Sequence, residues 1–535
     1  MKKPSVPASE PGLSPGLRRY LYFTAALTGS AVMIVEILGA KMLSPYVGTS
    51  HFVWTAQIAV TLVALSAGYY VGGRLVDRSP RLGRLYWCIL SAAFYLALTV
   101  AACRPVTYWC LEVGGKYSLA IGSLLASALL FFVPLALLAM VGPFVVRVLA
   151  SAVTSVGGTM GRLTAISTLG SVAGTILIGY VLIPFLPNSV TMWLTALGLV
   201  LGCAGYFAGW GRKSSSLTPV WLVIATAVAA GYAGVRAEQA RPAHSREVFR
   251  GNSNFGLLQV IDSPDGATRY YLNDYLYQNT YDRQEKRSTS MFTYLLHGLA
   301  RAYTTNITDA LCIGLGVGIV PMQLAAEGAR VDVVEINPAV VPLAEKFFDL
   351  KPEKLNLTIG DGRFFLNQCR QHYDAVILDA FLGDSSPSHL MSREAFTAIR
   401  RVLKPGGVLV INSFGDFEPG RDFFTASLHK TLKTVFPGVR IHARPGGGNV
   451  LFVATDTPEP RFLHAPNVDS VHPSVRWATE SAFANVMDTH PDHGRLLTDD
   501  FNPVEFFDAK NREANRRSLA MSMKSFGKTE DEDGL

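Results

Sequence analysis

The apolar positions of this chain change their pattern near residue 240. Before that point, seven long apolar runs follow one another, at about residues 20–43, 53–76, 85–103, 118–146, 163–183, 189–210 and 218–235. Each is close to the roughly 20 residues that a bilayer-spanning helix needs. After residue 240 the apolar runs are short, β-rich and end in glycine or a carboxylate. We therefore predict an all-α transmembrane helical domain followed by an α/β domain with a parallel sheet.

The same patterns divide the chain into segments. We predict disordered tails over 1–18 and 511–535, a transmembrane domain over 19–237, a linker and small β domain over 238–290, and a nucleoside-binding α/β domain over 291–510. A hairpin is expected within the small β domain, with its turn at residues 263–266. Residues 1–240 hold 16 Lys+Arg and 5 Asp+Glu, a net charge of +11, whereas residues 241–535 hold 32 and 36, a net charge of −4. The basic charge is typical of membrane flanks, and nothing indicates nucleic-acid binding.

Basic residues also predict the orientation in a membrane. They gather before the first run and after the second, fourth and sixth, whereas the opposite loops hold only Lys41, Arg104 and Lys116. We expect a multi-pass protein of the cell (inner) membrane with its amino terminus in the cytoplasm. Seven crossings would place the C-terminal half outside, but the basic residues that begin at Arg236 favour the cytoplasm. We expect a cytoplasmic C-terminal half, and the conflict with the helix count stays open.

Glu36 stands out because it is an acid inside an apolar run. A charge at membrane depth is costly and is by default a functional hypothesis. A cationic substrate, a proton, a partner at a helix end or a structural pairing could each account for it. Elsewhere in this half, Gly68 with Gly72, and Gly170 with Gly174, have the spacing of closely packed helices.

The first two strands of the α/β domain end in residues suited to a nucleoside. Gly314, Gly316 and Gly318 follow the first strand and allow the backbone to approach a ligand closely. Glu335 ends the second strand and is placed to accept hydrogen bonds from two ribose hydroxyls. The pyrophosphate-binding pattern G-x-G-x-x-G is absent, which favours a nucleoside without a pyrophosphate over NAD.

Two further strands end in carboxylates. Asp361 ends the third strand, ahead of Gly362, and could read an adenine amino group. Asp379 ends the fourth strand, where reacting atoms would lie, although it could instead hold loop amides. Because ligands of α/β sheets bind at the carboxyl ends of the strands, the four endings together predict a nucleoside site.

At this point the residues resemble a family. The segments Glu335-Ile-Asn-Pro, Asp361-Gly-Arg and Tyr373-Asp-x-x-Ile-Leu-Asp379 are similar to those of the spermidine synthases, which are aminopropyltransferases that use decarboxylated S-adenosylmethionine. The whole chain resembles their membrane-bound relatives, in which a multi-helix region precedes the synthase domain. The resemblance implies a Rossmann-like domain of the S-adenosylmethionine-dependent methyltransferase type, with Gln278 of a Gln-x-Thr signature in the nucleoside site. It also implies that the sulfonium compound is a co-substrate, with no resident cofactor.

The chain departs from this family where the acceptor would bind. The family carries an Asp-Glu pair and a Tyr there, and the same offsets here hold Arg283, Gln284 and Arg287. Those carboxylates would grip a diamine, so their absence places putrescine in doubt. Asp282 and Glu285 lie nearby and could substitute for them.

The family also has a flexible gate after its catalytic carboxylate. Asp384 is the corresponding candidate for binding the amine, and the alternative is a solvated loop ahead of a helix capped by Ser392. Asp379 is the candidate catalytic residue, since a protonated amine needs a carboxylate that orients it and takes its proton.

Three classes of function remain open. The first is an aminopropyltransferase acting on an amine such as putrescine, the second an S-adenosylmethionine-dependent methyltransferase, and the third a membrane transporter or sensor with a regulatory nucleoside domain. The expected partners are the amine, the adenosyl sulfonium compound and the lipid bilayer, and a homodimer is compatible with the sequence. The six cysteines show no metal-binding spacing, so no metal site is expected.

Overall fold

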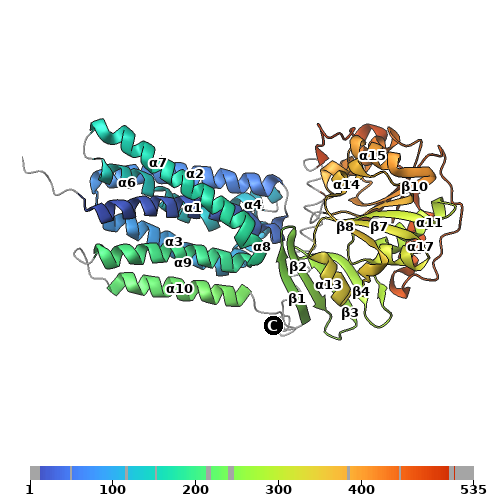
Figure 1. Cartoon of the computed structure of the whole chain (residues 1–535), viewed down its shortest axis with the longest axis horizontal. Coiled ribbons are helices and arrows are strands. Elements are labelled where there is room, and N and C mark those ends of the chain that lie inside the picture. The colour runs from blue at the N-terminus through green and yellow to red at the C-terminus, as the bar shows by residue number, and fades with distance from the viewer. Residues whose placement is uncertain are drawn as a thin grey trace, which may run out of the picture. The chain divides into compact units, whose positions relative to one another are not determined.

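The computed structural model describes residues 13–48, 51–114, 118–150, 153–211, 218–238, 246–381, 386–444, 448–504 and 511. The chain divides into two compact units, Met1–Ala240 and Arg241–Leu535 (Figure 1). Most of the two predicted tails lies outside the described residues. The first helix begins at Pro15, with Ser14 as its N-cap, so the end of the predicted tail 1–18 is helical.

The first unit consists of helices. Its elements are α1 (Pro15–Val47), α2 (His51–Arg78), α3 (Leu82–Val113), α4 (Leu119–Ser127), α5 (Val133–Ala139), α6 (Val141–Leu149), α7 (Val153–Leu177), α8 (Ile183–Phe185), α9 (Asn188–Gly209) and α10 (Thr218–Glu238). Two of the predicted single helices are interrupted, because π-helical turns join α4 to α5 at Ala128–Phe132 and α7 to α8 at Ile178–Leu182. A π-helical turn contains one residue more than an α-helical turn, and the sequence of an apolar run does not show where such a turn occurs.

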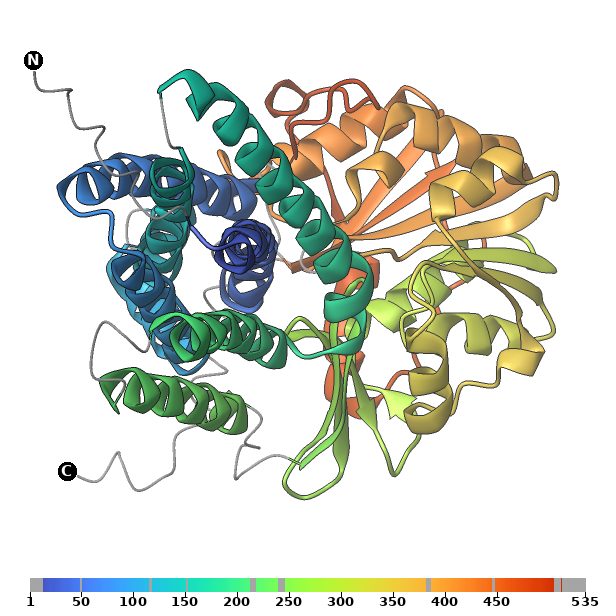
Figure 2. The same ribbon diagram turned by 60° about the vertical axis from the view of Figure 1, so that its left-hand side comes forward.

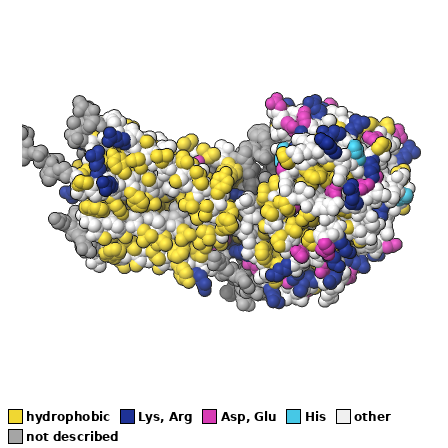
Figure 3. All heavy atoms as spheres, in the orientation of Figure 1, with side chains coloured by type: hydrophobic (Ala, Val, Ile, Leu, Met, Phe, Trp, Pro, Cys, Tyr) yellow, Lys and Arg dark blue, Asp and Glu magenta, His cyan; other side chains and the backbone are white. Residues whose placement is uncertain are grey.

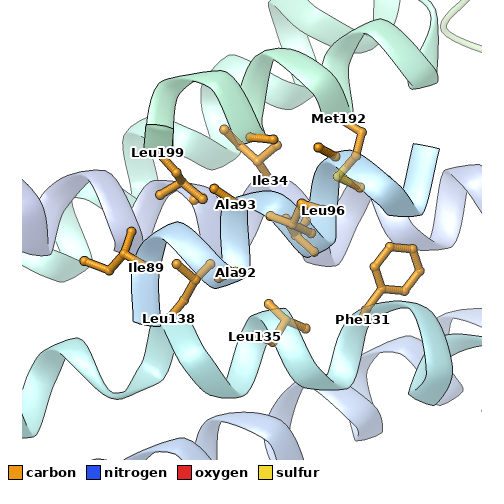
Figure 4. Packing of buried hydrophobic residues seen from close by; sticks show 14 of the residues in the cluster. Ile34, Ile89, Ala92, Ala93, Leu96, Phe131, Leu135, Leu138, Met192 and Leu199 are labelled. Atoms are coloured by element: carbon orange, nitrogen blue, oxygen red, sulfur yellow. The ribbon is translucent and has the colours of Figure 1, made fainter. Parts of the chain in front are cut away.

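Helix α1 is the centre of this unit. It packs against α2 to α7 and α9, and Figure 2 shows it in dark blue, ringed by other helices. Glycines permit the closest approach, because a Cβ at Gly170 would lie 2.1 Å from the Ala26 carbonyl oxygen of α1. The buried side chains of α1, α3, α5 and α9 interdigitate in the core that Figure 4 shows around Ile34, Leu96 and Leu135.

The surface of the first unit is apolar along its length. Among the described residues, seven helical spans are long and apolar enough to cross a membrane, from Pro15–Val47 to Thr218–Glu238. Figure 3 shows hydrophobic side chains over much of the visible face of this unit and Lys and Arg side chains gathered near one end. This distribution is compatible with insertion into a bilayer.

The second unit begins with a five-stranded antiparallel sheet. Its strands pair in chain order and are β1 (Arg246–Ser253), β2 (Gly256–Asp262), β3 (Thr268–Asn273), β4 (Leu276–Asp282) and β5 (Arg287–Ser288). Strands β2 and β3 form the predicted hairpin.

An eight-stranded sheet forms the rest of the second unit. Its order is β13-β11-β12-β10-β9-β6-β7-β8, with strands β6 (Asp309–Ile313), β7 (Arg330–Glu335), β8 (Asn356–Ile359), β9 (Tyr373–Leu378), β10 (Leu403–Gly415), β11 (Gly438–Ala443), β12 (Gly448–Thr455) and β13 (Val486–Met487). The strands from β10 to β8 are parallel, and β11 to β13 are antiparallel additions at one edge. This is a Rossmann-like sheet whose strand order reverses between β6 and β9, the place where such sheets bind ligands.

Helices cover both faces of this sheet. Alternate strand residues pack on one face against α11 (Met291–Tyr303), α12 (Ile319–Ala326), α13 (Val340–Phe347) and α17 (Pro473–Ala484). The other residues pack against α14 (Gly362–Gln368), α15 (Arg393–Val402) and α16 (Phe423–Lys433). Helix α16 lies between β10 and β11 in the chain.

Candidate functional site

The predicted strand endings meet at one edge of the large sheet. Ile313 of β6 pairs with Val334 of β7 on one side and with Leu378 of β9 on the other. The residues that follow, Gly314 and Asp379, are therefore level with the end of β7. Their backbones touch, since a Cβ at Gly314 would lie 2.2 Å from the Asp379 carbonyl oxygen. Only glycine allows this approach.

The glycine loop leaves an open space beside that contact. All three glycines have positive φ, at 97° for Gly314, 56° for Gly316 and 87° for Gly318. Gly318 is the left-handed residue that starts α12. A Cβ at Gly316 would meet no atom within 4 Å. At Gly316 the loop thus presents bare backbone to open space, which leaves room for a ligand.

The Glu335 carboxylate holds this loop through hydrogen bonds to backbone amides. Its Oε2 accepts a hydrogen bond from the Leu315 amide at 2.9 Å, and its Oε1 accepts one from the Asn337 amide at 2.8 Å. Burial raises the pKa of this carboxyl, and backbone amides of Leu315, Asn337 and Ile336 partly offset the effect. Because each carboxylate oxygen has two lone pairs, both can still accept a ribose hydroxyl. The predicted ribose acceptor is thus also the structural support of the loop.

Asp361 starts α14 as its N-cap. Its Oδ1 accepts from the Phe364 amide at 2.8 Å, and its Oδ2 lies 2.9 Å from His389 Nε2. Desolvation would raise the pKa of Asp361, but these partners outweigh it, and the pKa is lowered. Gly362 has to be glycine, because a Cβ would lie 2.5 Å from a methyl carbon of Ile313. His389 was not singled out from the sequence, since its loop gives no periodic signal.

The segment near residue 500 supports the same corner of the site. Asp499 accepts hydrogen bonds from Arg363 at 2.9 Å and from the Ser392 hydroxyl at 2.5 Å. Asn502 donates to the Ser388 carbonyl at 3.0 Å, next to His389. Ser392 caps α15, as the alternative to the gate expected. Residues more than 100 positions further along the chain thus hold the side chains around Asp361 in place.

Asp379 is held by a chain of two amides. Its Oδ1 accepts from Asn412 Nδ2 of β10 at 2.9 Å, and Asn412 Oδ1 accepts from Asn449 Nδ2 of β12 at 3.0 Å. Asn412 is buried. Asp379 is itself only partly buried, yet desolvation of its carboxyl raises its pKa to about 6, against the lowering effect of Asn412. The Asn449 contact fixes which end of the Asn412 amide faces the carboxylate.

The sequence contained a signal for Asn412 but none for Asn449. Asn412 follows a buried apolar run beside β9, so it shares the strand-end edge with Asp379. Asn449 belongs to an antiparallel strand whose pairing no local pattern specifies. Asp384, the predicted amine-binding residue of the gate, lies outside the described residues.

Gln278 is the extra residue of a β-bulge. Tyr271 pairs with Asn279 and Leu272 with Tyr277, so Gln278 has no opposite residue. Bulges of this kind re-aim side chains and are frequent at functional sites. The small sheet also lies near Glu335, because burial, the charge of Glu335 and the charge of Asp274 raise the pKa of Tyr271. Its role in binding stays a prediction.

The residues expected to hold the amine form a separate group. Asp282 uses Oδ1 to accept the amides of Gln284 and Glu285 in the turn after β4. Its Oδ2 lies 3.5 Å from His472 Nε2. Arg283 points to the Gly266 carbonyl, which it reaches at 2.7 Å. No described hydrogen bond joins Asp282 to the strand-end residues.

The C-terminal unit is similar to polyamine aminopropyltransferases and to methyltransferases. Residues 290–444 match the model of the spermine/spermidine synthase domain. The chain is 32% identical over 234 residues to a polyamine aminopropyltransferase of Vibrio vulnificus, covering 42% of this chain and 77% of that protein. It is 35% identical over 150 residues to an N-terminal histidine N-methyltransferase of Emericella nidulans, covering 27% of this chain but only 26% of that protein. A crystal structure of a probable spermidine synthase from Corynebacterium glutamicum aligns at 17% identity and a TM-score of 0.36, over 46% of this chain and 88% of that one.

Proposed function

Since this chain belongs to the polyamine aminopropyltransferase family through its C-terminal unit, we propose that it transfers an aminopropyl group from decarboxylated S-adenosylmethionine to an amine. The observation that carries the proposal is the position of Asp379. It adjoins the open glycine loop, with one carboxylate oxygen held by Asn412 and a pKa near neutrality. The sulfonium compound is then a co-substrate, and the reaction needs no resident cofactor.

The proposed reaction is a single displacement. The nitrogen of the acceptor amine attacks the aminopropyl carbon next to the cationic sulfur, and the C–S bond breaks. The electron pair goes to sulfur, which leaves as the neutral thioether methylthioadenosine. The new C–N bond leaves one excess proton on nitrogen, and Asp379 accepts a proton from this amine. With a pKa of about 6, its carboxyl is mostly ionised at pH 7 and can act as the base.

The other strand-end residues would position the nucleoside. The proposal assigns the ribose hydroxyls to Glu335 and the adenine amino group to Asp361, with the glycine loop beneath the sugar. Holding both reactants in line at Asp379 would supply much of the acceleration. Gln278, re-aimed by its bulge, would contribute from the small sheet.

We also propose which residues bind the acceptor amine. Asp282 and Glu285, with His472 at 3.5 Å and 3.8 Å, offer two carboxylates where the family's own pair is replaced. A diamine such as putrescine could place its second ammonium there. Asp384 would assist from the gate.

We further propose that the helical unit spans the cell membrane with the amino terminus in the cytoplasm. The seven apolar spans and the gathered basic side chains support this. A cytoplasmic catalytic unit would give it access to its sulfonium substrate, although an odd number of crossings opposes that placement.

Methyl transfer from S-adenosylmethionine is the second candidate. Arg283, Gln284 and Arg287 stand where the family carries its Asp-Glu pair and Tyr, and this replacement favours methyl transfer, as does the similarity to a methyltransferase. Both reactions use the same nucleoside contacts, so the acceptor and the transferred group have to be measured.

The test offers each sulfonium compound to the purified full-length protein with putrescine, spermidine and agmatine in turn. Aminopropyl transfer releases methylthioadenosine, whereas methyl transfer releases S-adenosylhomocysteine, and chromatography separates the two. We expect methylthioadenosine from the wild type and a loss of about 10²–10⁴-fold in turnover for Asp379→Asn, the usual contribution of a general base. Release of S-adenosylhomocysteine alone would replace the proposal with the second candidate.

A further inference from the structure

The helical unit contains a buried polar side chain without a partner. Gln57 of α2 has no solvent-exposed surface, and neither its Nε2 nor its Oε1 atom has a hydrogen-bond partner. The amide faces α1 at Gly39, where an added Cβ would lie 2.7 Å from Nε2. Buried polar groups are nearly always satisfied, so an amide that is buried without a partner needs an explanation.

A second buried polar group without a partner lies on α4, which packs against α2. Helices α1, α2 and α4 each pack against the other two. Gly68 of α2 lies against Ala136 and Gly72 lies against Met140, so the two helices run parallel and Gln57, about three turns earlier, is at about the height of Ser127 at the end of α4. The Ser127 hydroxyl is buried and also lacks a partner. The π-helical turn begins at the next residue, Ala128, and such turns are frequent at functional sites.

Helix α1 carries an acid one turn from Gly39. Glu36 lies on α1 one turn before Gly39, on the side of α1 that also carries Ala40. No hydrogen bond or ion pair joins its carboxyl to another described residue. The structural pairing considered from the sequence is therefore not seen in the described part of the chain.

We propose that Glu36, Gln57 and Ser127 form a binding site for an organic ammonium ion inside the helical unit. A carboxylate, an amide oxygen and a hydroxyl oxygen all accept hydrogen bonds, and an ammonium group has three N–H donors. The carboxylate balances its charge, which membrane depth otherwise makes costly. The site uses none of the residues assigned to group transfer, so the helical unit binds an amine on its own account.

Carbodiimide labelling of Glu36 tests the site directly. Dicyclohexylcarbodiimide enters apolar regions and reacts with protonated carboxyls, and mass spectrometry identifies the modified peptide. A bound ammonium keeps Glu36 ionised and covered. Putrescine at about ten times its Kd should therefore slow labelling of the full-length protein in lipid nanodiscs by about tenfold, because only empty sites react. Glu36→Gln verifies the labelled position.

The variants decide what causes the protection. Gln57→Leu should abolish it without lowering the melting temperature, because the amide makes no hydrogen bond that the change would remove. Thr226→Val is the matched control, since its hydroxyl bonds only to the Leu222 and Val223 carbonyls of its own helix, and protection should persist there. Absent protection in the wild type, equal protection by sodium chloride, or full protection in Gln57→Leu would each overturn the proposal. Because the readout is at Glu36, it is independent of transferase activity.

Discussion

The hydrogen bond that Asn412 donates to Asp379 should affect how the activity depends on pH. Replacing Asn412 by leucine, a side chain of similar shape, removes the N–H that Asp379 Oδ1 accepts at 2.9 Å. A hydrogen bond to a charged group is worth about 1.5–3 kcal/mol, and a pKa unit corresponds to about 1.4 kcal/mol. The pKa of Asp379, about 6 in the wild type, should therefore rise by roughly one to two units in Asn412→Leu.

The consequence is a loss of activity that depends on pH. At pH 7 about nine-tenths of the wild-type carboxyl is ionised, and in Asn412→Leu about a tenth to a half would be. The ratio of variant to wild-type kcat/KM should fall to about 0.1–0.5 at pH 7 and approach one near pH 9. Taking the ratio cancels the ionisation of the amine substrate itself. Asn449→Leu, which only frees Asn412 to rotate, should show a smaller shift of the same sign.

The assay is the release of methylthioadenosine between pH 5.5 and 9.5, with the KM for the sulfonium compound measured at each end. A ratio that stays constant across this range would refute the reasoning, since it would mean that Asn412 only orients Asp379. A loss that grows as pH rises would refute it as well.

Thermal stability gives an independent measure of the same pKa. Because the folded-state pKa of Asp379 exceeds its ordinary value of 3.8, the contribution of this carboxyl to stability is full below about pH 4 and is lost as the pH rises through 6. The shift corresponds to at most about 3 kcal/mol, and partial solvent exposure reduces it. Asp379→Asn, which still accepts from Asn412, should thus melt higher than the wild type at pH 7 and equally near pH 4. Equal melting at both pH values would contradict the raised pKa.

Three further predictions follow from the site and the helices. Glu335→Gln should weaken binding of the sulfonium compound by roughly 1–3 kcal/mol in calorimetry, through a lost acceptor for ribose, and unchanged affinity would remove Glu335 from the site. Gly316→Ala should weaken the same binding and cost only about 1–2 kcal/mol of stability. Gly314→Ala should unfold the loop, because its Cβ would meet the Asp379 carbonyl oxygen at 2.2 Å. Equal stability of the two variants would argue against this close contact. A cysteine placed at Ser79, with the native cysteines replaced, should escape an impermeant thiol reagent in intact cells, and labelling would reverse the proposed orientation; the same probe at Ser474 reports the side of the catalytic unit.

The sequence by itself determined the apolar helical spans, the parallel strands and the edge at which the strand endings meet, but not the π-helical turns within the helices. The period and the length of an apolar run distinguish a bilayer-length helix from a buried strand, and both can be seen in the sequence because they depend only on residues close together in the chain. The carboxyl ends of parallel strands meet at one edge whatever the loops do, so Gly314, Glu335, Asp361 and Asp379 could be placed together in advance. The sequence also showed the Gln-x-Thr signature with Gln278, but it did not show that Gln278 lies in a β-bulge.

Only the tertiary structure decided which partners complete those residues. Asn449 reaches Asn412 because β12 returns antiparallel beside β10, and His389 reaches Asp361 from a loop that the segment near Asp499 holds in place. The lack of a hydrogen-bond partner for the Gln57 amide is known only from the structure, in which α2 packs against α1 and α4. Hydrogen bonds between residues far apart in sequence depend on register and helix rotation, which local hydrophobic patterns leave free. The predicted chemistry of each strand end was therefore local, whereas the pKa of Asp379 and the isolation of Gln57 are properties of the assembled fold.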